Sequence, residues 1–118
     1  MAIFEVEYWK VKPGKEEDHG RAMRGWLQWV NDHRDLFGEW RSVRYFVKEI
    51  AGEQSGFHFV MWEYDSLAAF EAYKARRGDY RGEYAEYKKN DPYYMDVFDH
   101  TDMRIEVWKD IDRDLWIE

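Results

Sequence analysis

The 118-residue sequence has no cysteine, only two prolines and no long apolar segment. Without cysteine the chain contains no disulfide, thiolate nucleophile, zinc–cysteine site or iron–sulfur cluster. No apolar run approaches the roughly 20 residues of a membrane-spanning helix. The N-terminal stretch MAIFEVE also lacks the basic segment of a secretion signal. These absences predict a cytoplasmic protein with no membrane partner.

Positive charge is also scarce. The chain has 18 Lys and Arg against 25 Asp and Glu, which gives a formal net charge of −7. Such a surface repels phosphate backbones, so we expect no nucleic-acid partner. Because no linker, repeat or low-complexity run is present, residues 1–118 are predicted to form a single domain. The tail 110–118 is expected to be loose or to add a short strand.

Aromatic residues, in contrast, are abundant: seven Trp, nine Tyr and seven Phe. Each such side chain buries about 150 to 250 Å² in a folded protein. The total is large for the interior of one small monomer. We therefore expect some of this aromatic surface to contact another chain.

Hydrophobic periodicity predicts an alternating order of strands and helices. Alternation with a period of two indicates strands, and apolar recurrence every three or four residues indicates helices. The sequence GEQSG at 52–56 is typical of a hairpin turn. The order is strand, helix, strand, strand, helix, strand, which predicts an α+β, ferredoxin-like split βαβ fold: a four-stranded antiparallel sheet with both helices on one face. The predicted strands are 3–11, 41–51, 57–64 and 102–109, and the predicted helices are 15–36 and 66–89, the latter interrupted at Gly78.

One face of this sheet is left without helices. On the third strand, Phe57, Phe59 and Met61 are expected to face the helices, which turns the alternate residues toward the open face. An uncovered sheet would then expose an apolar patch larger than monomers usually tolerate. We therefore predict a homodimer in which two open faces pack together. The residues expected in this patch are Val60, Trp62, Phe46 and Ile50, with Tyr8 or Trp9.

Two segments resemble a known family. VKPGKEED at the first strand-to-helix junction and MWEYDSLAAFEAY at the second are similar to the junctions of the dimeric α/β-barrel proteins, which include an antibiotic-biosynthesis-monooxygenase-like group and stress-responsive barrel proteins. With the order of elements, the resemblance covers residues 2–109. It implies that two sheets pack as a dimeric α/β barrel and that any pocket lies between sheet and helices. The family includes cofactor-free oxygenases, heme-degrading enzymes, isomerases and members without known chemistry.

Neither a cofactor nor a metal is predicted. The heme-degrading branch of the family has Asn, Trp and His where this chain has Glu7, Tyr73 and Glu83, so the resemblance implies no heme. The four histidines lack metal-ligand spacing. The acidic run that begins at Asp110 starts like a calcium loop, but Leu115 stands where that loop requires glycine.

Glu5 and Glu7 are the most informative polar pair. They lie two residues apart on the first strand, so both side chains share one face. Burial would raise their pKa and suit them to acid–base chemistry; the alternative is structural pairing with Arg44, Lys48 or Arg104. Apolar alternation places Phe4, Val6 and Tyr8 against the helices, whereas the register of the resembled family places Glu5 and Glu7 there. The sequence leaves both registers open.

The candidate site follows from these residues. We predict Glu7, His58 and Tyr73 as catalytic residues, and Glu5, Trp62, Trp26 and Tyr84 as substrate-binding residues. His58 is the best imidazole base, although packing at an interface is an alternative for it; His19 is expected to face solvent and His33 to pack. The predicted function is a cofactor-independent, monooxygenase-like or isomerase-like enzyme acting on a hydrophobic aromatic small molecule. The alternative is a non-catalytic dimeric ligand-binding or stress-related module.

Overall fold

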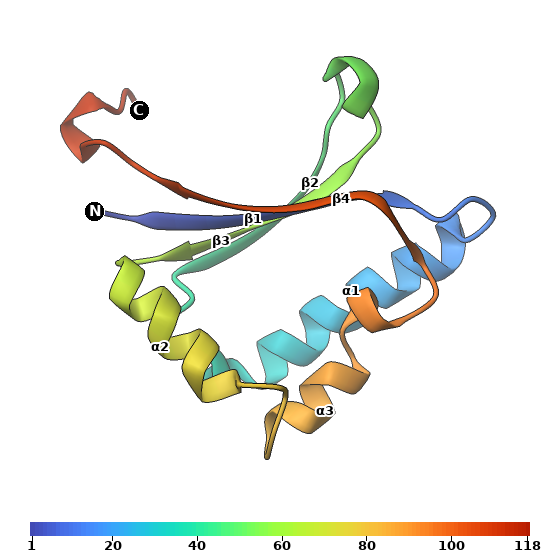
Figure 1. Ribbon diagram of the computed structural model, residues 1–118, viewed down its shortest axis with the longest axis horizontal. Helices are drawn as coiled ribbons and strands as arrows, with labels where there is room; N and C mark the ends of the chain where they lie inside the picture. The colour runs from blue at the N-terminus through green and yellow to red at the C-terminus, as the bar shows by residue number, and fades with distance from the viewer.

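The computed structural model describes residues 1–118 and confirms the predicted order of elements. Its four strands form one antiparallel sheet in the order β2-β3-β1-β4. This is the α+β, ferredoxin-like arrangement, and Figure 1 shows the α-helices together on one side of the sheet. The strands are β1 (Ile3–Val11), β2 (Ser42–Val47), β3 (His58–Tyr64) and β4 (Phe98–Lys109).

The helical layer contains α1 (Glu16–Asp32), α2 (Leu67–Arg77) and α3 (Tyr84–Lys89), with short 3-10 turns between elements. Three acidic residues occupy the first turn of α1, where the helix dipole favours negative charge. Ser66 caps α2, because its hydroxyl oxygen accepts a hydrogen bond from the backbone N–H of Ala69 at 3.1 Å. No helix is long and apolar enough to cross a membrane.

Several element boundaries differ from the prediction. The strand expected over 41–51 ends at Val47, because the connection to β3 includes the 3-10 turn η2 (Gly52–Gln54). Gly52 and Gly56 have φ angles of 59° and 86°, which side chains with a Cβ rarely adopt. β4 starts at Phe98, earlier than expected, since its first residues pair with the end of β1 after a register shift. The tail forms the 3-10 turn η4 (Arg113–Leu115) instead of a strand.

The predicted face assignment of β3 is wrong. Val60, Trp62 and Tyr64 are buried against the helices, whereas Phe59 and Met61 lie on the open face with Val6 and Tyr8. Both sets of β3 side chains are apolar, so alternation alone did not distinguish them. The same register settles β1: Glu5 and Glu7 lie on the helix side, paired with Trp62 and Val60 of β3, as the family register implied.

An aromatic core fills the space between sheet and helices. Two of its indole groups have hydrogen-bond partners inside the layer: the Trp26 indole donates to the Tyr87 hydroxyl and the Trp40 indole to the Tyr64 hydroxyl, both at 3.1 Å. Buried Trp and Tyr usually require such partners. These hydrogen bonds fix the orientation of the rings that surround the site.

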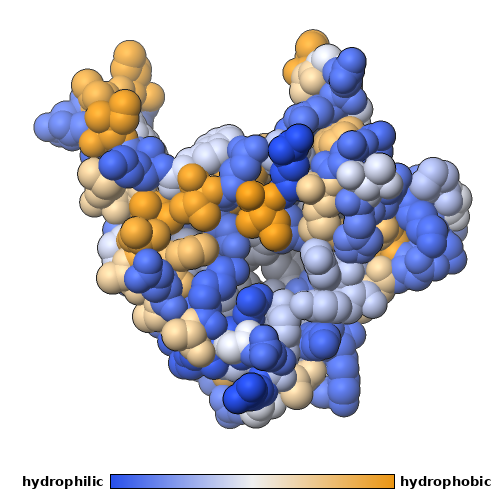
Figure 2. Space-filling model, in the orientation of Figure 1, coloured by the Kyte–Doolittle hydropathy of each residue, from blue (hydrophilic) through white to orange (hydrophobic).

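The opposite face of the sheet carries a second apolar cluster that no helix covers. Val6, Tyr8 and Phe57 are buried there under neighbouring side chains, while Phe46 and Trp108 remain 41% and 47% exposed. Figure 2 shows further apolar side chains on two projections, the C-terminal tail and the β2–β3 connection. Ile50, at the second projection, is 94% exposed.

Candidate functional site

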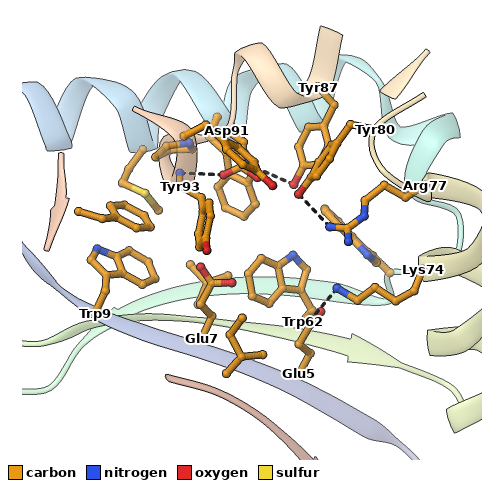
Figure 3. A pocket seen from close by; sticks show the side chains of 18 of the residues that line it. Glu5, Glu7, Trp9, Trp62, Lys74, Arg77, Tyr80, Tyr87, Asp91 and Tyr93 are labelled. Atoms are coloured by element: carbon orange, nitrogen blue, oxygen red, sulfur yellow. Dashed lines mark hydrogen bonds and ion pairs between the residues drawn. The ribbon is translucent and has the colours of Figure 1, made fainter. Parts of the chain in front are cut away.

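A cavity of about 230 Å³ lies between the sheet and the helical layer (Figure 3). One end is closed by Trp9, whose ring stacks on Phe98 with the centroids 4.3 Å apart. Ile105, on the same wall, is 57% exposed, so the cavity opens to solvent beside β4, where Figure 2 shows the surface hollowed. The lining is mostly aromatic and includes Trp26, Trp62, Tyr73, Tyr80, Tyr87 and Tyr93, together with the charged residues Glu5, Glu7, Lys74, Arg77 and Asp91.

Glu5 is a satisfied structural carboxylate. Its side chain is buried, and it accepts hydrogen bonds from Lys74 Nζ at 2.8 Å and from the Tyr64 hydroxyl at 3.2 Å. Within the chain, the alternative pairing of Glu5 with Arg44, Lys48 or Arg104 does not form. Arg44 lies opposite Met61 and Arg104 opposite Tyr8 in the sheet, so both are on the open face. Lys48 packs over the Tyr8 ring on that same face. The partner of Glu5 comes from α2 instead.

Glu7 has no such partner. Its carboxyl group makes no hydrogen bond and no ion pair, although it lies inside the cavity. Burial, reinforced by the negative charges of Asp91 and Glu5, raises the pKa of Glu7 to about 8. The group is therefore mostly protonated at neutral pH and titrates close to it. A carboxyl with these properties is suited to exchanging a proton with a bound molecule.

Asp91 is a second cavity carboxyl, and the sequence analysis missed it. It precedes the 3-10 turn η3 (Pro92–Tyr94), where its Oδ1 accepts a hydrogen bond from the Tyr93 backbone N–H at 3.0 Å. Burial raises the pKa of Asp91 to about 6. In the sequence, Asn90-Asp91-Pro92 indicated only the end of a helix. An Asp directly before Pro is also a capping pattern. A cap uses one carboxyl oxygen, and the sequence does not show that the Asp91 side chain also lines the cavity.

Arg77 supplies positive charge that no carboxylate neutralises by contact. Its guanidinium donates to the Tyr80 hydroxyl at 2.9 Å, and its Nε–H is buried without a partner. Tyr80 has a φ of 62°, in the left-handed region that non-glycine residues rarely adopt. Such backbone conformations cost on the order of 1 kcal/mol and are concentrated at functional sites. The hydrogen bond thus links Tyr80 and Arg77 at the cavity wall.

The structure brings together five of the seven predicted site residues. Glu5, Glu7, Trp26, Trp62 and Tyr73 all line the cavity. The indole N–H of Trp62 is buried without a hydrogen-bond partner.

The other two predicted site residues lie outside the lining. The Tyr84 hydroxyl donates to the Leu36 carbonyl at 2.6 Å, which is a structural role in the helical layer. His58 contacts the Tyr45 hydroxyl and packs against His19 with the rings 4.8 Å apart. The expectation that His19 faces solvent is wrong, because it is 2% exposed and its Nε2 accepts a hydrogen bond from the Trp9 indole at 3.0 Å.

The chain was compared with protein families, curated proteins and solved structures, and only solved structures are similar to it. No protein-family model matches the chain. No curated protein matches it either. Among solved structures, a NIPSNAP family protein from Agrobacterium tumefaciens superposes with a TM-score of 0.66 at 16% identity, over 96% of both chains. A dimeric protein of unknown function and ferredoxin-like fold from Bacteroides fragilis has a TM-score of 0.59 at 11% identity and covers 92% of this chain and 95% of its own.

A third similar structure is a putative antibiotic biosynthesis monooxygenase from Bacteroides thetaiotaomicron, with a TM-score of 0.58 at 8% identity over 99% of this chain and 96% of that one. Similarities at such low identity show the fold. The chain has the ferredoxin-like fold found in these NIPSNAP and monooxygenase-like proteins, as its strand-to-helix junctions indicated. One of these neighbours, the Bacteroides fragilis protein, is described as dimeric.

Proposed function

We propose that this protein is a small-molecule enzyme that binds a hydrophobic aromatic compound in the cavity and catalyses proton transfer on it through Glu7. The reaction class is isomerase-like. The observation that carries the proposal is the unpaired Glu7 carboxyl, which titrates near neutral pH inside an otherwise aromatic cavity. A carboxyl whose only role were structural would be paired, as Glu5 is.

The size of the cavity limits the ligand. Pockets for drug-sized molecules begin at about 300 Å³, and a cavity of about 150 Å³ accommodates benzene. A volume of about 230 Å³ therefore suits a compact molecule of one or two rings. Ring faces of Trp and Tyr favour a flat aromatic ligand through stacking and edge contacts.

The charges define the chemistry that the cavity supports. A carbonyl or phenol oxygen that becomes negative during proton transfer would be stabilised by the uncompensated Arg77 guanidinium. If dioxygen then reacted with the resulting carbanion, the outcome would be a cofactor-independent monooxygenase. The likeness to a putative monooxygenase keeps that reaction as the second candidate.

The test uses 2-tetralone, a compact aromatic ketone whose acidic C–H bonds exchange with D₂O. Ligand binding is followed by quenching of Trp fluorescence, and exchange is followed by mass spectrometry. We expect the protein to accelerate exchange and Glu7→Gln to lower the rate by about 100-fold or more. The matched control is Glu86→Gln, which removes an exposed carboxylate on α3 that pairs with Lys89.

Three results are distinguishable. Equal exchange by wild type and Glu7→Gln would refute the role of Glu7. Binding without exchange would indicate the non-catalytic ligand-binding module. Oxygenated products that form only under air would favour the monooxygenase.

We further propose that the homodimer forms through the open face of the sheet. The exposed side chains of Phe46 and Trp108 lie on this face, beside an apolar cluster that the helices leave uncovered. Two copies packed face to face would remove this apolar surface from water and form an α/β barrel. The helix-side cavity stays outside such an interface, so each subunit would have its own site.

A further inference from the structure

Asp91 lines the same cavity as Glu7, but the proposed function so far assigns it no contact with the ligand. Figure 3 shows Glu7 rising from β1 on the sheet side and Asp91 on the opposite, helical side. Neither carboxyl group forms an ion pair. Two carboxyl groups without cationic partners on opposite walls of one aromatic cavity are unusual, because buried acids are normally paired or kept apart.

Building on the proposed function, we propose that Asp91 is a second catalytic residue, and that Asp91 and Glu7 act as a base and an acid on two different atoms of one ligand. The ligand class is a small aromatic carbonyl compound with a C–H bond next to the carbonyl group. The reaction is a keto–enol or double-bond isomerisation.

The placement of Asp91 fits this role. Its Oδ1 is held by the Tyr93 backbone N–H, which fixes the side chain, and no protein group binds Oδ2. Glu7 is held by the regular ladder of β1, opposite Val60 of β3. Both side chains therefore extend from hydrogen-bonded backbone, and a ligand in the space between them would contact both.

Electrostatics assigns the two roles. The pKa of Asp91 is about 6 and that of Glu7 about 8, so near pH 7 the aspartate is mostly ionised and the glutamic acid protonated. Separated pKa values of this kind identify the base and the acid of a pair. The other charged groups that face them are Glu5 on β1 and Lys74 and Arg77 on α2. The tyrosines at 73, 80 and 87 remain neutral, because burial raises their pKa.

The reaction balances without any other reagent. Asp91 takes a proton from the carbon next to the carbonyl group, and Glu7 gives a proton to the oxygen, or to a distal carbon of a conjugated system. Arg77 stabilises the oxygen while it is negative. After the step Asp91 is protonated and Glu7 ionised. Return of the proton to Glu7 is favoured by about 100-fold, because the two pKa values differ by about two units.

The test compares wild type with Asp91→Asn, which preserves the cap because an Asn side chain accepts the same Tyr93 N–H. Asp96→Asn is the control, since Asp96 is an exposed carboxylate paired with Lys12 outside the cavity. The first readout needs no substrate: ¹³C NMR of glutamate carboxyl groups, with the Glu7 resonance assigned from Glu7→Gln. We expect one carboxyl to titrate near pH 8 in wild type and Asp96→Asn, and at a lower pH in Asp91→Asn.

The second readout is the pH profile of 2-tetralone exchange. In wild type the rate should rise as Asp91 loses its proton near pH 6 and fall as Glu7 loses its own near pH 8, which gives a maximum near pH 7. Asp91→Asn should lower the rate by about 100-fold and abolish the rise on the acid side.

The experiments distinguish the proposed role of Asp91 from that of Glu7. Unchanged Glu7 titration and an unchanged acid limb in Asp91→Asn would overturn the role of Asp91 and leave that of Glu7. Absence of exchange in wild type, with ligand bound, would overturn both catalytic assignments. A loss of rate in Asp91→Asn with an unchanged profile shape would reduce Asp91 to a cap of η3.

Discussion

Replacing Glu7 by Gln should change the dependence of stability on pH. In the folded protein the pKa of Glu7 is raised from 4.5 to about 8, whereas in the unfolded chain it returns to the ordinary value. Between these two values the folded state binds a proton that the unfolded state has lost. The free energy of unfolding therefore falls as pH rises through this range. Below about pH 4.5 the Glu7 carboxyl does not lower the free energy of unfolding, and above about pH 8 it lowers it by the full amount.

The magnitude follows from the same difference. Each pKa unit corresponds to about 1.4 kcal/mol, so ionising Glu7 in the folded protein costs at most about 5 kcal/mol. Water in the open cavity screens the charge, and about 2 to 4 kcal/mol is a realistic expectation between pH 5 and pH 9. Gln has the same shape and no charge to lose. Glu7→Gln should thus be more stable than wild type at pH 9 and similar to it at pH 5.

The assay is urea denaturation at pH 5, 7 and 9, at one fixed chain concentration because the proposed dimerisation would make stability depend on concentration. Glu86→Gln, which alters only the exposed surface of α3, serves as the reference. The raised pKa of Asp91 also makes the free energy of unfolding fall with pH, over a lower pH range. This contribution is present in every variant, so the comparison of wild type with Glu7→Gln is not affected by it. If wild type and Glu7→Gln lose stability in parallel from pH 5 to pH 9, the Glu7 carboxyl is not desolvated and the proposed chemistry loses its basis.

Three further predictions concern other parts of the molecule. Lys74→Met should lower the free energy of unfolding by about 3 kcal/mol in urea titrations, because it leaves the buried Glu5 carboxylate unpaired, whereas Lys89→Met on the surface should have little effect. Burial lowers the pKa of His19 to about 4, so His19 should remain neutral in NMR titrations at pH 5, and its contribution to stability should be lost as pH falls from 6.5 toward 4. Phe46→Glu should convert the proposed dimer to monomer in sedimentation experiments, and an unchanged dimer would exclude the open face as the interface.

The fold was readable from the sequence because its determinants are local. The alternation of the strands and the turn sequence at 52–56 each depend on a few neighbouring positions. The face of β3 was not readable in the same way. One set of its side chains packs under the helices and the other lies on the open face, and both sets are apolar. Alternation therefore did not indicate which set faces the helices.

The site was only partly predictable, for a related reason. Glu5 and Glu7 drew attention because two carboxylates two residues apart share one face of a strand, and the structure places both in the cavity. Asp91 and Arg77 lie in segments that look like ordinary polar ends of helices. Only the folded topology brings positions 7 and 91 to one cavity. No periodicity in the sequence indicates that these two positions line the same cavity. His19 was misjudged similarly: its burial depends on Trp9, which lies on another element.

The two sides of β1 have a consequence for how this protein can diverge. Odd-numbered positions such as 5 and 7 face the cavity, and even-numbered positions such as 6 and 8 face the uncovered cluster. Substitutions on one side of the strand can therefore alter the cavity without changing the uncovered cluster, or the reverse. Inserting or deleting one residue within this strand would exchange both sets at once, so mutational drift in its length should be far less tolerated than drift in its composition.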